Sequence, residues 1–199
     1  MKDSVPDDFR WDAQAVVVGG SAGGIDALLA LVDGLPQDYP LPLIAVLHLP
    51  ETHESRLPEL FAPRVALRVR EAAALMPVEP RTLYLAPSGY HLLVEPDRTF
   101  SLSCEPPVLF SRPAIDVLME SAADAYGPAL VGIVLTGASE DGARGLACVR
   151  ARGGLAAVQS PAEAQHAVMP GAALARANPQ FVLPLAGLQR LLQRLGARA

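Results

Sequence analysis

The sequence predicts an α/β fold, a doubly wound and mostly parallel sheet with helices on both faces and a small antiparallel hairpin. Short apolar runs alternate with Ala- and Leu-rich stretches of helical period, which is typical of strands joined by crossover helices. Hydrophobic residues make up 51% of the chain and charged residues only 19%. This composition excludes a disordered chain and indicates a larger interior than a small helix bundle requires.

The chain length fits one domain. A globular protein of 199 residues buries about 70% of the surface that its unfolded chain exposes, which is enough for one core. No linker longer than a turn, no internal repeat and no low-complexity stretch divides the sequence. We therefore expect a short N-terminal tail over residues 1–14 and a single domain over residues 15–199.

The first half of the chain begins with a strand, a glycine-rich loop and a helix. Residues 15–18 are an apolar, β-branched run that ends at Gly19 and Gly20, and residues 24–35 carry apolar side chains at helical spacing. Further strands are expected at residues 43–47, at 65–69 with Arg68 and Arg70 pointing outward, and at 82–86. Residues 91–94 and 99–102 are two more strand-like runs, and the polar turn between them predicts a hairpin. We therefore expect the middle of the chain to be antiparallel.

The second half of the chain repeats the alternation of helix and strand. Pro113 opens a helix with Ile115 and Leu118 on one face, and Gly127 follows its end. Residues 130–135 form the most strongly apolar strand of the chain. The remaining elements are expected as helices over residues 141–152, 170–177 and 185–195 and as strands over 155–158 and 181–183.

Charge, hydropathy and cysteine usage exclude several classes of protein. The net charge is −5 and no basic block is interleaved with aromatic residues, so nucleic acid is not an expected partner. No apolar run reaches the roughly 18 residues of a membrane helix, and the polar N-terminus is unlike a signal peptide, so no membrane insertion is expected. Because Cys104 and Cys148 lie in unrelated contexts, we expect no disulfide, no metal site, no cofactor and a cytoplasmic location.

The loop after the first strand places Ser21 among small residues, in the sequence Gly-Gly-Ser-Ala-Gly-Gly over residues 19–24. Such a turn projects a serine oxygen above the sheet, and the following helix offers free N–H groups to an oxyanion. A loop that binds an anion or a dinucleotide is the alternative. It fits less well, because Ser21 stands where the Rossmann fingerprint requires Gly and the G-K-[ST] ending of a phosphate loop is missing. The turn alone leaves both readings open.

His48 and Asp141 follow two other predicted strands. Taken singly, His48 is compatible with a structural histidine and Asp141 with an ordinary helix cap. Because the carboxyl ends of parallel strands meet at one edge of a sheet, we expect Ser21, His48 and Asp141 to assemble as nucleophile, base and orienting acid. A pairing of Asp116 with His166 is less favoured, since the first lies inside a predicted helix and the second precedes one.

These motifs resemble the catalytic domain of the chemotaxis protein-glutamate methylesterases of the CheB type, from about residue 15 to the C-terminal helix. Several separate motifs occur in the order of that family, which makes chance agreement improbable. They are the loop 19–24, His48-Leu49-Pro50, Leu135-Thr136-Gly137 with Asp141-Gly142-Ala143, Tyr84-Leu85-Ala86-Pro87, Arg112-Pro113 with Asp116-Val117-Leu118, and Met169-Pro170 with Ala173.

The resemblance implies the roles of individual residues. Ser21 would be the nucleophile, His48 the general base and Asp141 the carboxylate that orients it. The family also uses a backbone N–H group at the position of Ala138 in its oxyanion hole, and we expect Ala22, Ala138 and Arg112 to contribute to oxyanion or substrate binding. The departures from the family pattern are Ala22 for Thr, Ser111 for His, Ala138 for Met, Ser139 for Gly and Val168 for Gly.

The function implied by the resemblance is hydrolysis of γ-glutamyl methyl esters, and deamidation of glutamine, on the cytoplasmic helices of methyl-accepting chemoreceptors. Two alternatives are a non-catalytic adaptor module of a signalling array and an esterase for another ester. Family members commonly carry an N-terminal receiver domain, whereas about 14 residues precede the first strand here. We therefore expect either constitutive activity or control by a separate receiver protein.

Overall fold

The computed structural model describes residues 2–48 and 56–197. Leu49 and Pro50 of the expected histidine motif lie outside the described residues.

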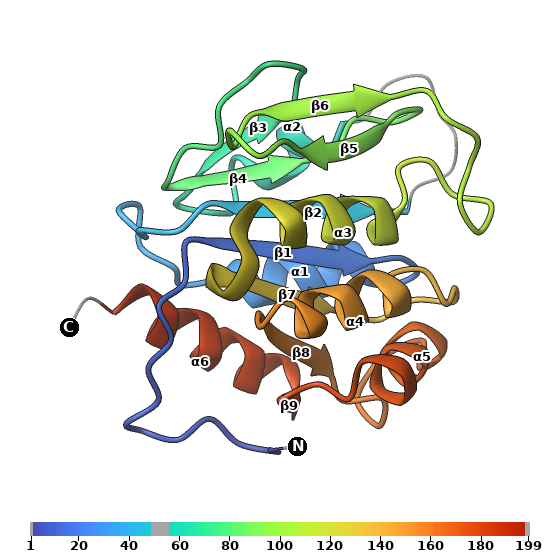
Figure 1. Ribbon diagram of the computed structural model, residues 1–199. Coiled ribbons are helices and arrows are strands. Elements are labelled where there is room, and N and C mark those ends of the chain that lie inside the picture. The colour runs from blue at the N-terminus through green and yellow to red at the C-terminus, as the bar shows by residue number, and fades with distance from the viewer. Residues whose placement is uncertain (1, 49–55, 198–199) are drawn as a thin grey trace.

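Within the described residues, seven parallel strands form one sheet in the order β3-β4-β2-β1-β7-β8-β9 (Figure 1). A separate hairpin pairs β5 (His91–Val94) antiparallel with β6 (Phe100–Ser103). The expected fold class is therefore confirmed. The strands of the sheet are β1 (Ala15–Gly20), β2 (Leu43–Leu47), β3 (Arg68–Glu71), β4 (Thr82–Leu85), β7 (Leu130–Val134), β8 (Leu155–Gln159) and β9 (Phe181–Leu183).

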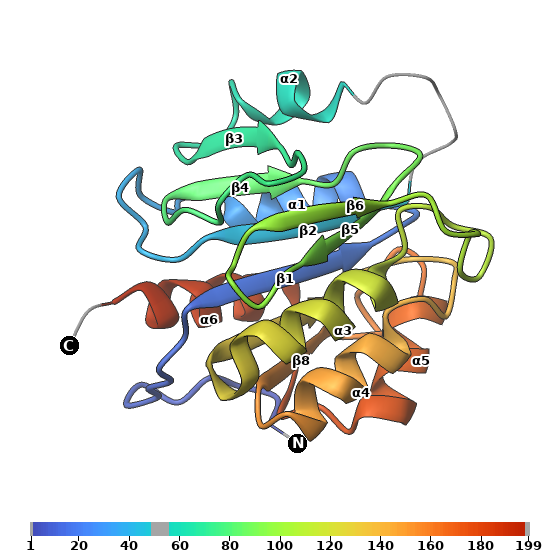
Figure 2. The ribbon, with the colours of Figure 1, turned by 45° about the horizontal axis from the view of Figure 1, so that its top comes forward.

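Helices cover both faces of the sheet. Alternate residues of a strand point to opposite faces, so Val16 and Val18 of β1 pack into one core layer and Ala15 and Val17 into the other. Figure 1 shows α3 and α4 in front of the sheet and α1 behind it, and the turned view of Figure 2 groups α3, α4 and α5 on one side. The first layer contains α1 (Gly24–Val32), α2 (Leu57–Phe61) and α6 (Leu185–Gly196), and the second contains α3 (Ile115–Tyr126), α4 (Ala143–Ala151), α5 (Val168–Ala177) and the hairpin.

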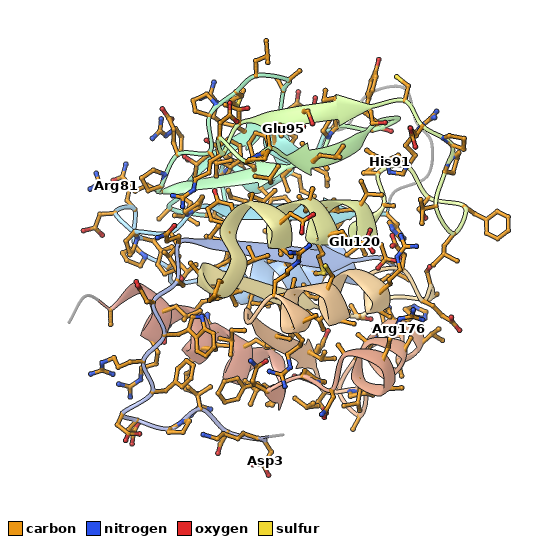
Figure 3. All side chains as sticks on the ribbon, viewed as in Figure 1. Asp3, Arg81, His91, Glu95, Glu120 and Arg176 are labelled. Carbon is orange, nitrogen blue, oxygen red and sulfur yellow. The ribbon has the colours of Figure 1, made fainter. Side chains whose placement is uncertain are left out.

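Charged side chains lie at the periphery of these layers. Asp3, Arg81 and Arg176 are exposed, and Figure 3 shows Asp3 and Arg81 at the rim of the molecule. Arg68 and Arg70 of β3 are also exposed, as the alternation of that strand predicts. In the ranges 2–48 and 56–197, no helix is both long enough and apolar enough to cross a membrane.

Several expected elements differ from the structure at their ends, and two of these differences have a clear cause in the backbone. The helix expected over residues 24–35 ends at Val32, because Asp33 has extended backbone angles and Gly34 a positive φ of 71°. The helix expected from Asp141 begins at Ala143, because Gly142 has a φ of 93°, which an α-helix does not allow.

The expected antiparallel middle is wrong for β3 and β4. These two strands pair in parallel, because residues 72–81 carry the chain back to the starting end of β3 before β4 begins. The strand expected at residues 65–69 is β3, shifted toward the C-terminus. Only the hairpin of β5 and β6 is antiparallel among the named strands.

The expected N-terminal tail packs against the domain. Lys2 pairs in parallel with Phe181 of β9, its N–H donating to Gln180 O (2.8 Å) while its C=O accepts from Val182 N–H (3.0 Å). The ring of Phe9 meets that of Phe181 edge to face, with 5.2 Å between centroids. The segment thus contacts the β9 edge through the backbone of Lys2 and the ring of Phe9.

Candidate active site

Three loops meet at the carboxyl edge of the sheet. β1 lies between β2 and β7 and is parallel to both, so the loops that follow these strands share one edge. Backbone hydrogen bonds extend the pairing, with Ser21 N–H donating to Thr136 O (3.0 Å) and His48 N–H donating to Gly20 O (3.0 Å). The loop of Asp141 begins beside them, after β7.

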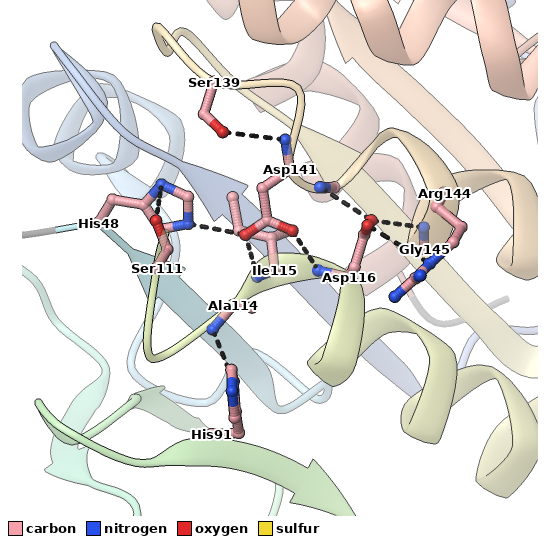
Figure 4. Close-up of polar contacts among 11 residues, drawn as sticks. His48, His91, Ser111, Ala114, Ile115, Asp116, Ser139, Asp141, Arg144 and Gly145 are labelled. Atoms are coloured by element: carbon pink, nitrogen blue, oxygen red, sulfur yellow. Dashed lines mark hydrogen bonds and ion pairs between the residues drawn. The ribbon is translucent and has the colours of Figure 1, made fainter. Parts of the chain in front are cut away.

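His48 and Asp141 are in direct contact (Figure 4). His48 Nε2 lies 2.8 Å from Asp141 Oδ2, and the Asp141 side chain is 0% exposed. The carboxylate also accepts the backbone N–H groups of Ile115 (2.6 Å) and Asp116 (2.9 Å), which open α3. Because a helix N-terminus favours negative charge, α3 stabilises the carboxylate and fixes its orientation toward the imidazole. Asp141 therefore caps α3 and not the helix that follows it in sequence.

Asp116, in the first turn of α3, in turn accepts hydrogen bonds from the beginning of α4. Its Oδ1 accepts the N–H groups of Gly142 (2.9 Å) and Gly145 (2.7 Å), and Arg144 Nε lies 3.5 Å from its Oδ2. Burial raises the pKa of Asp116, and the neighbouring charge of Asp141 adds to this effect. Asp116, considered above as an alternative catalytic acid, thus lies behind Asp141 and holds the loop that carries it.

Ser21 lies beside His48 without a hydrogen bond between their side chains in the described part of the chain. The second ring nitrogen, His48 Nδ1, lies 3.3 Å from Ser111 Oγ instead. The His48 side chain is 10% exposed, so the ring has little access to water. The structure brings His48 and Asp141 together, while the role of Ser21 as nucleophile stays a prediction.

Ala22 and Ala138 flank Ser21 on two loops. Thr136 links these loops to a third, because its Oγ1 donates to Ala22 O (3.1 Å) and accepts from His166 N–H (2.8 Å). Over residues 2–48 and 56–197, the backbone N–H groups of Ala22 and Ala138 have no acceptor within the protein. Two such free donors beside a serine are suited to an oxyanion, and this role also stays a prediction.

Two polar residues to which the sequence analysis assigned no role, Gln159 and Ser139, support the loops of the site. Gln159 is 2% exposed, and its Oε1 accepts Thr136 N–H (2.8 Å). Ser139 Oγ accepts Asp141 N–H (3.2 Å). A polar residue at the end of an apolar strand is a signal that would have identified Gln159, whereas nothing in the local sequence indicates the contact of Ser139.

Arg112 holds a loop of the protein. Its Nη1 donates to the carbonyl oxygens of Cys104 (3.0 Å) and Glu105 (3.1 Å), and the buried Nε has no partner among the described residues. The peptide bond between Arg112 and Pro113 is cis. The expected contact of Arg112 with substrate stays a prediction.

His91 has a structural environment. It is 1% exposed, its Nδ1 accepts Ala114 N–H (3.2 Å), and its Nε2 therefore donates to Pro106 O (3.1 Å). Within the described ranges, no group of three His, Cys, Asp or Glu side chains is placed to hold a metal ion. Cys104 and Cys148 are free thiols.

Comparison with known proteins places these features in a family context. The family model described as CheB methylesterase matches residues 16–192. A Leptospira interrogans protein, named for protein-glutamate methylesterase and protein-glutamine glutaminase activities, is 38% identical over 92% of this chain and 94% of its own length. Protein-glutamate methylesterase FrzG of Myxococcus xanthus is 35% identical over 90% of this chain, which spans 54% of FrzG.

A solved structure has the same fold. The crystal structure of the Thermotoga maritima CheB methylesterase catalytic domain superposes with a TM-score of 0.85 at 27% sequence identity. The match covers 90% of this chain and 97% of that one.

Proposed function

Because the chain belongs to the CheB methylesterase family, we propose that it is a protein-glutamate methylesterase, a serine hydrolase that cleaves γ-glutamyl methyl esters on chemoreceptors. The proposal extends to its cytoplasmic location and to the cytoplasmic helices of methyl-accepting chemoreceptors as substrate. The two free thiols are compatible with a reducing compartment. The net charge of −5 offers no long-range attraction to acidic helices, so recognition rests on contacts near the site.

The observation that supports this function most strongly is the contact of His48 with Asp141. An imidazole bound at 2.8 Å to a fully buried carboxylate is held in one tautomer and is stabilised when it takes up a proton. The pair lies at the same sheet edge as Ser21, because His48 N–H donates to the carbonyl oxygen of Gly20, the residue before Ser21. Such an arrangement provides a base for a serine hydroxyl and has no evident purpose in packing alone.

Acyl transfer begins with attack of Ser21 Oγ on the ester carbonyl carbon. The ring nitrogen of His48 that faces away from Asp141, Nδ1, accepts the hydroxyl proton. The N–H groups of Ala22 and Ala138 donate to the oxyanion that forms. As the intermediate collapses, the bond to the methoxy oxygen breaks, and the imidazolium returns its proton so that methanol leaves. Water then attacks the acyl-enzyme with His48 again as base, which releases the glutamate carboxylate and restores Ser21.

The same groups would deamidate glutamine. Attack on the side-chain amide forms the same acyl-enzyme, and ammonia replaces methanol as the leaving group. This reaction depends more strongly on proton donation by the His48 imidazolium, because an amide nitrogen leaves only after it is protonated.

Methanol release from a methylated chemoreceptor tests the proposal. We expect release by the wild-type chain and a loss of at least about 10³-fold in Ser21→Ala, because nothing else in the oxyanion site replaces the nucleophile. Ser101→Ala, on the distant strand β6, is the matched control and should match wild type.

Equal release by wild type and Ser21→Ala would contradict the proposal. If the receptor is not a substrate, reaction of Ser21 with a fluorophosphonate distinguishes the two alternatives. A reactive Ser21 together with hydrolysis of a short acyl ester would indicate an esterase for another substrate. An inert Ser21 would indicate an adaptor.

A further inference from the structure

The imidazole of His48 is held at both of its nitrogens. Nε2 lies 2.8 Å from Asp141 Oδ2, and Nδ1 lies 3.3 Å from Ser111 Oγ. A carboxylate only accepts hydrogen bonds, so the proton of the neutral ring is on Nε2 and Nδ1 is the acceptor. The Ser111 hydroxyl therefore donates to the same ring nitrogen that must accept the proton of Ser21.

Ser111 is fixed in this position by its own turn. Ser111 N–H donates to Val108 O (2.9 Å), and Val108 N–H donates to Ser111 O (3.1 Å), which closes the turn over Leu109 and Phe110. The chain then continues into α3, whose first N–H groups bind Asp141. One segment, residues 111–116, thus contacts the base on Nδ1 and its carboxylate partner on the opposite side, as Figure 4 shows.

Ser111 lacks the surroundings of a nucleophile. Among the nearby N–H groups, that of Ser111 itself binds Val108 O, that of Ala114 binds His91, and those of the next two residues bind Asp141, which leaves that of Arg112 without an acceptor in the described ranges. Pro113 has no N–H at all. An oxyanion formed at Ser111 would therefore find one free backbone donor, that of Arg112, whereas Ser21 has two candidates, the N–H groups of Ala22 and Ala138, in the described ranges.

We propose that Ser111 is a positioning residue, which holds the His48 imidazole in a resting orientation and is replaced at Nδ1 by the Ser21 hydroxyl when an ester binds. The inference rests on the proposed function, in which His48 is the base for Ser21. A separation of 3.3 Å is long for an O–H donor and is easily exchanged. In this chain a hydroxyl thus stands where the resembled family commonly has His, and it competes for the base.

The replacement Ser111→Ala should give a characteristic change in the rate profile. Ser111 can donate only to unprotonated Nδ1, so its bond favours the neutral, active ring. Loss of this hydrogen bond should shift the acidic limb of the kcat/KM profile to higher pH by about 0.4 to 1 unit, which is the effect of one ordinary hydrogen bond. Because the competitor is gone, the plateau at higher pH should rise by the factor that corresponds to the same hydrogen bond, about 2.5- to tenfold. Asp141 contacts the imidazole, and Asp116 and Arg144 lie behind Asp141. All three charged groups are retained in the variant.

The experiment measures methanol release from about pH 5 to about pH 9 for wild type, Ser111→Ala and Ser111→Thr. Threonine keeps the hydroxyl and should restore the wild-type limb and plateau. Nitrogen-15 NMR of the His48 ring provides a readout that needs no substrate. We expect the Nδ1 resonance to indicate a hydrogen-bonded acceptor in wild type and Ser111→Thr and an unbonded one in Ser111→Ala.

Failure of this inference is distinguishable from failure of the proposed function. If neither wild type nor any variant releases methanol but the Nδ1 resonance responds to Ser111→Ala, the contact of Ser111 with His48 is supported and the proposed receptor substrate is contradicted. An unchanged resonance together with an unchanged profile would overturn the inference. So would a uniform loss of activity at every pH, which would indicate a purely structural serine, or a fluorophosphonate adduct on Ser111 of the wild-type chain.

Discussion

Gly137 keeps the loop of Ser21 and the loop after β7 closer together than any side chain would allow. A Cβ at this position would lie 2.9 Å from Ser21 Cβ and 2.6 Å from Met169 Sδ. Neither neighbour can retreat easily, because Met169 is fully buried and Ser21 is bound through its N–H to Thr136. The position of Ser21, the proposed nucleophile, therefore depends on the absence of a side chain at position 137 in the facing loop.

Gly137→Ala should displace Ser21. We expect methanol release to fall by about 10²-fold, the usual consequence of moving a reacting group by about 1 Å. Overpacking should lower the free energy of unfolding by about 1–3 kcal/mol. Steady-state kinetics and urea denaturation measure the two effects.

Gly171 offers the matched control for this substitution. It lies inside α5, and a Cβ there would have no neighbour within 4 Å. Gly171→Ala should keep full activity and raise the free energy of unfolding by about 0.5–1 kcal/mol, because alanine loses less backbone entropy in a helix. Wild-type activity in Gly137→Ala would show that the contact with Ser21 does not matter.

At the scale of elements, α3 and α4 cap each other. Asp141, just before α4, binds the first N–H groups of α3, and Asp116, in the first turn of α3, binds those of Gly142 and Gly145. Each helix thus supplies the carboxylate that the other needs at its N-terminus. The orientation of the Asp141 carboxylate is therefore a property of a helix pair and not of one loop.

The raised pKa of Asp116 gives this helix pair a pH dependence. A raised pKa means that the folded chain binds the proton more tightly than the unfolded chain does. Asp116 therefore contributes most to stability at low pH, and this contribution is lost as pH rises from the ordinary value of 3.8 through the raised one. Asp116→Asn, which keeps an acceptor for Gly142 and Gly145, should remove this loss.

Urea denaturation of wild type and Asp116→Asn at several values from about pH 4 to about pH 8 tests this expectation. The free energy of unfolding of wild type, relative to the variant, should fall as pH rises. Asp97→Asn is the control, because hydrogen bonds from Thr99 lower the pKa of Asp97, a shift in the direction opposite to that of Asp116. A constant difference between wild type and Asp116→Asn would contradict the prediction.

The sequence predicted the elements of the site better than their contacts. Ser21, His48 and Asp141 each follow an apolar strand, and such short-range patterns were sufficient to place all three at one edge. The contact of His48 with Asp141 was expected from this placement, but the other partners of these residues were not predictable in the same way. His48 meets Ser111 across 63 positions of the chain, and the carboxylate of Asp141 binds N–H groups 26 and 25 positions earlier. Contacts of this kind depend on how α3 is packed on the sheet, which no local pattern encodes.

At the scale of the whole molecule, the N-terminal segment belongs to the folded unit. The indole N–H of Trp11 donates to Pro128 O (3.1 Å), and the ring of Phe9 packs on Phe181. Because these contacts connect the segment both to the chain after α3 and to β9, we expect it to unfold together with the two core layers.

Trp11 reports on this directly, since it is the only tryptophan. In urea, the midpoint of the Trp11 fluorescence transition should coincide with that of far-UV circular dichroism. Phe9→Ala should weaken the attachment and shift the fluorescence midpoint below the circular dichroism midpoint. A fluorescence transition that precedes the other in the wild-type chain would show that the segment is attached only loosely.

The pairing of Lys2 with β9 has a consequence for encounters between copies of the chain. A sheet edge with free N–H and C=O groups is a template on which a strand of another molecule can add. At the β9 edge, the backbone of Lys2 already occupies groups on either side of Phe181. At the opposite edge, the short strand β3 presents the exposed charges of Arg68, Arg70 and Glu71. Both edges of the sheet thus discourage the addition of a strand from another molecule. At β9 the backbone of Lys2 already occupies the hydrogen-bonding groups, and at β3 the charged side chains oppose pairing, so we expect little association of copies through their sheet edges.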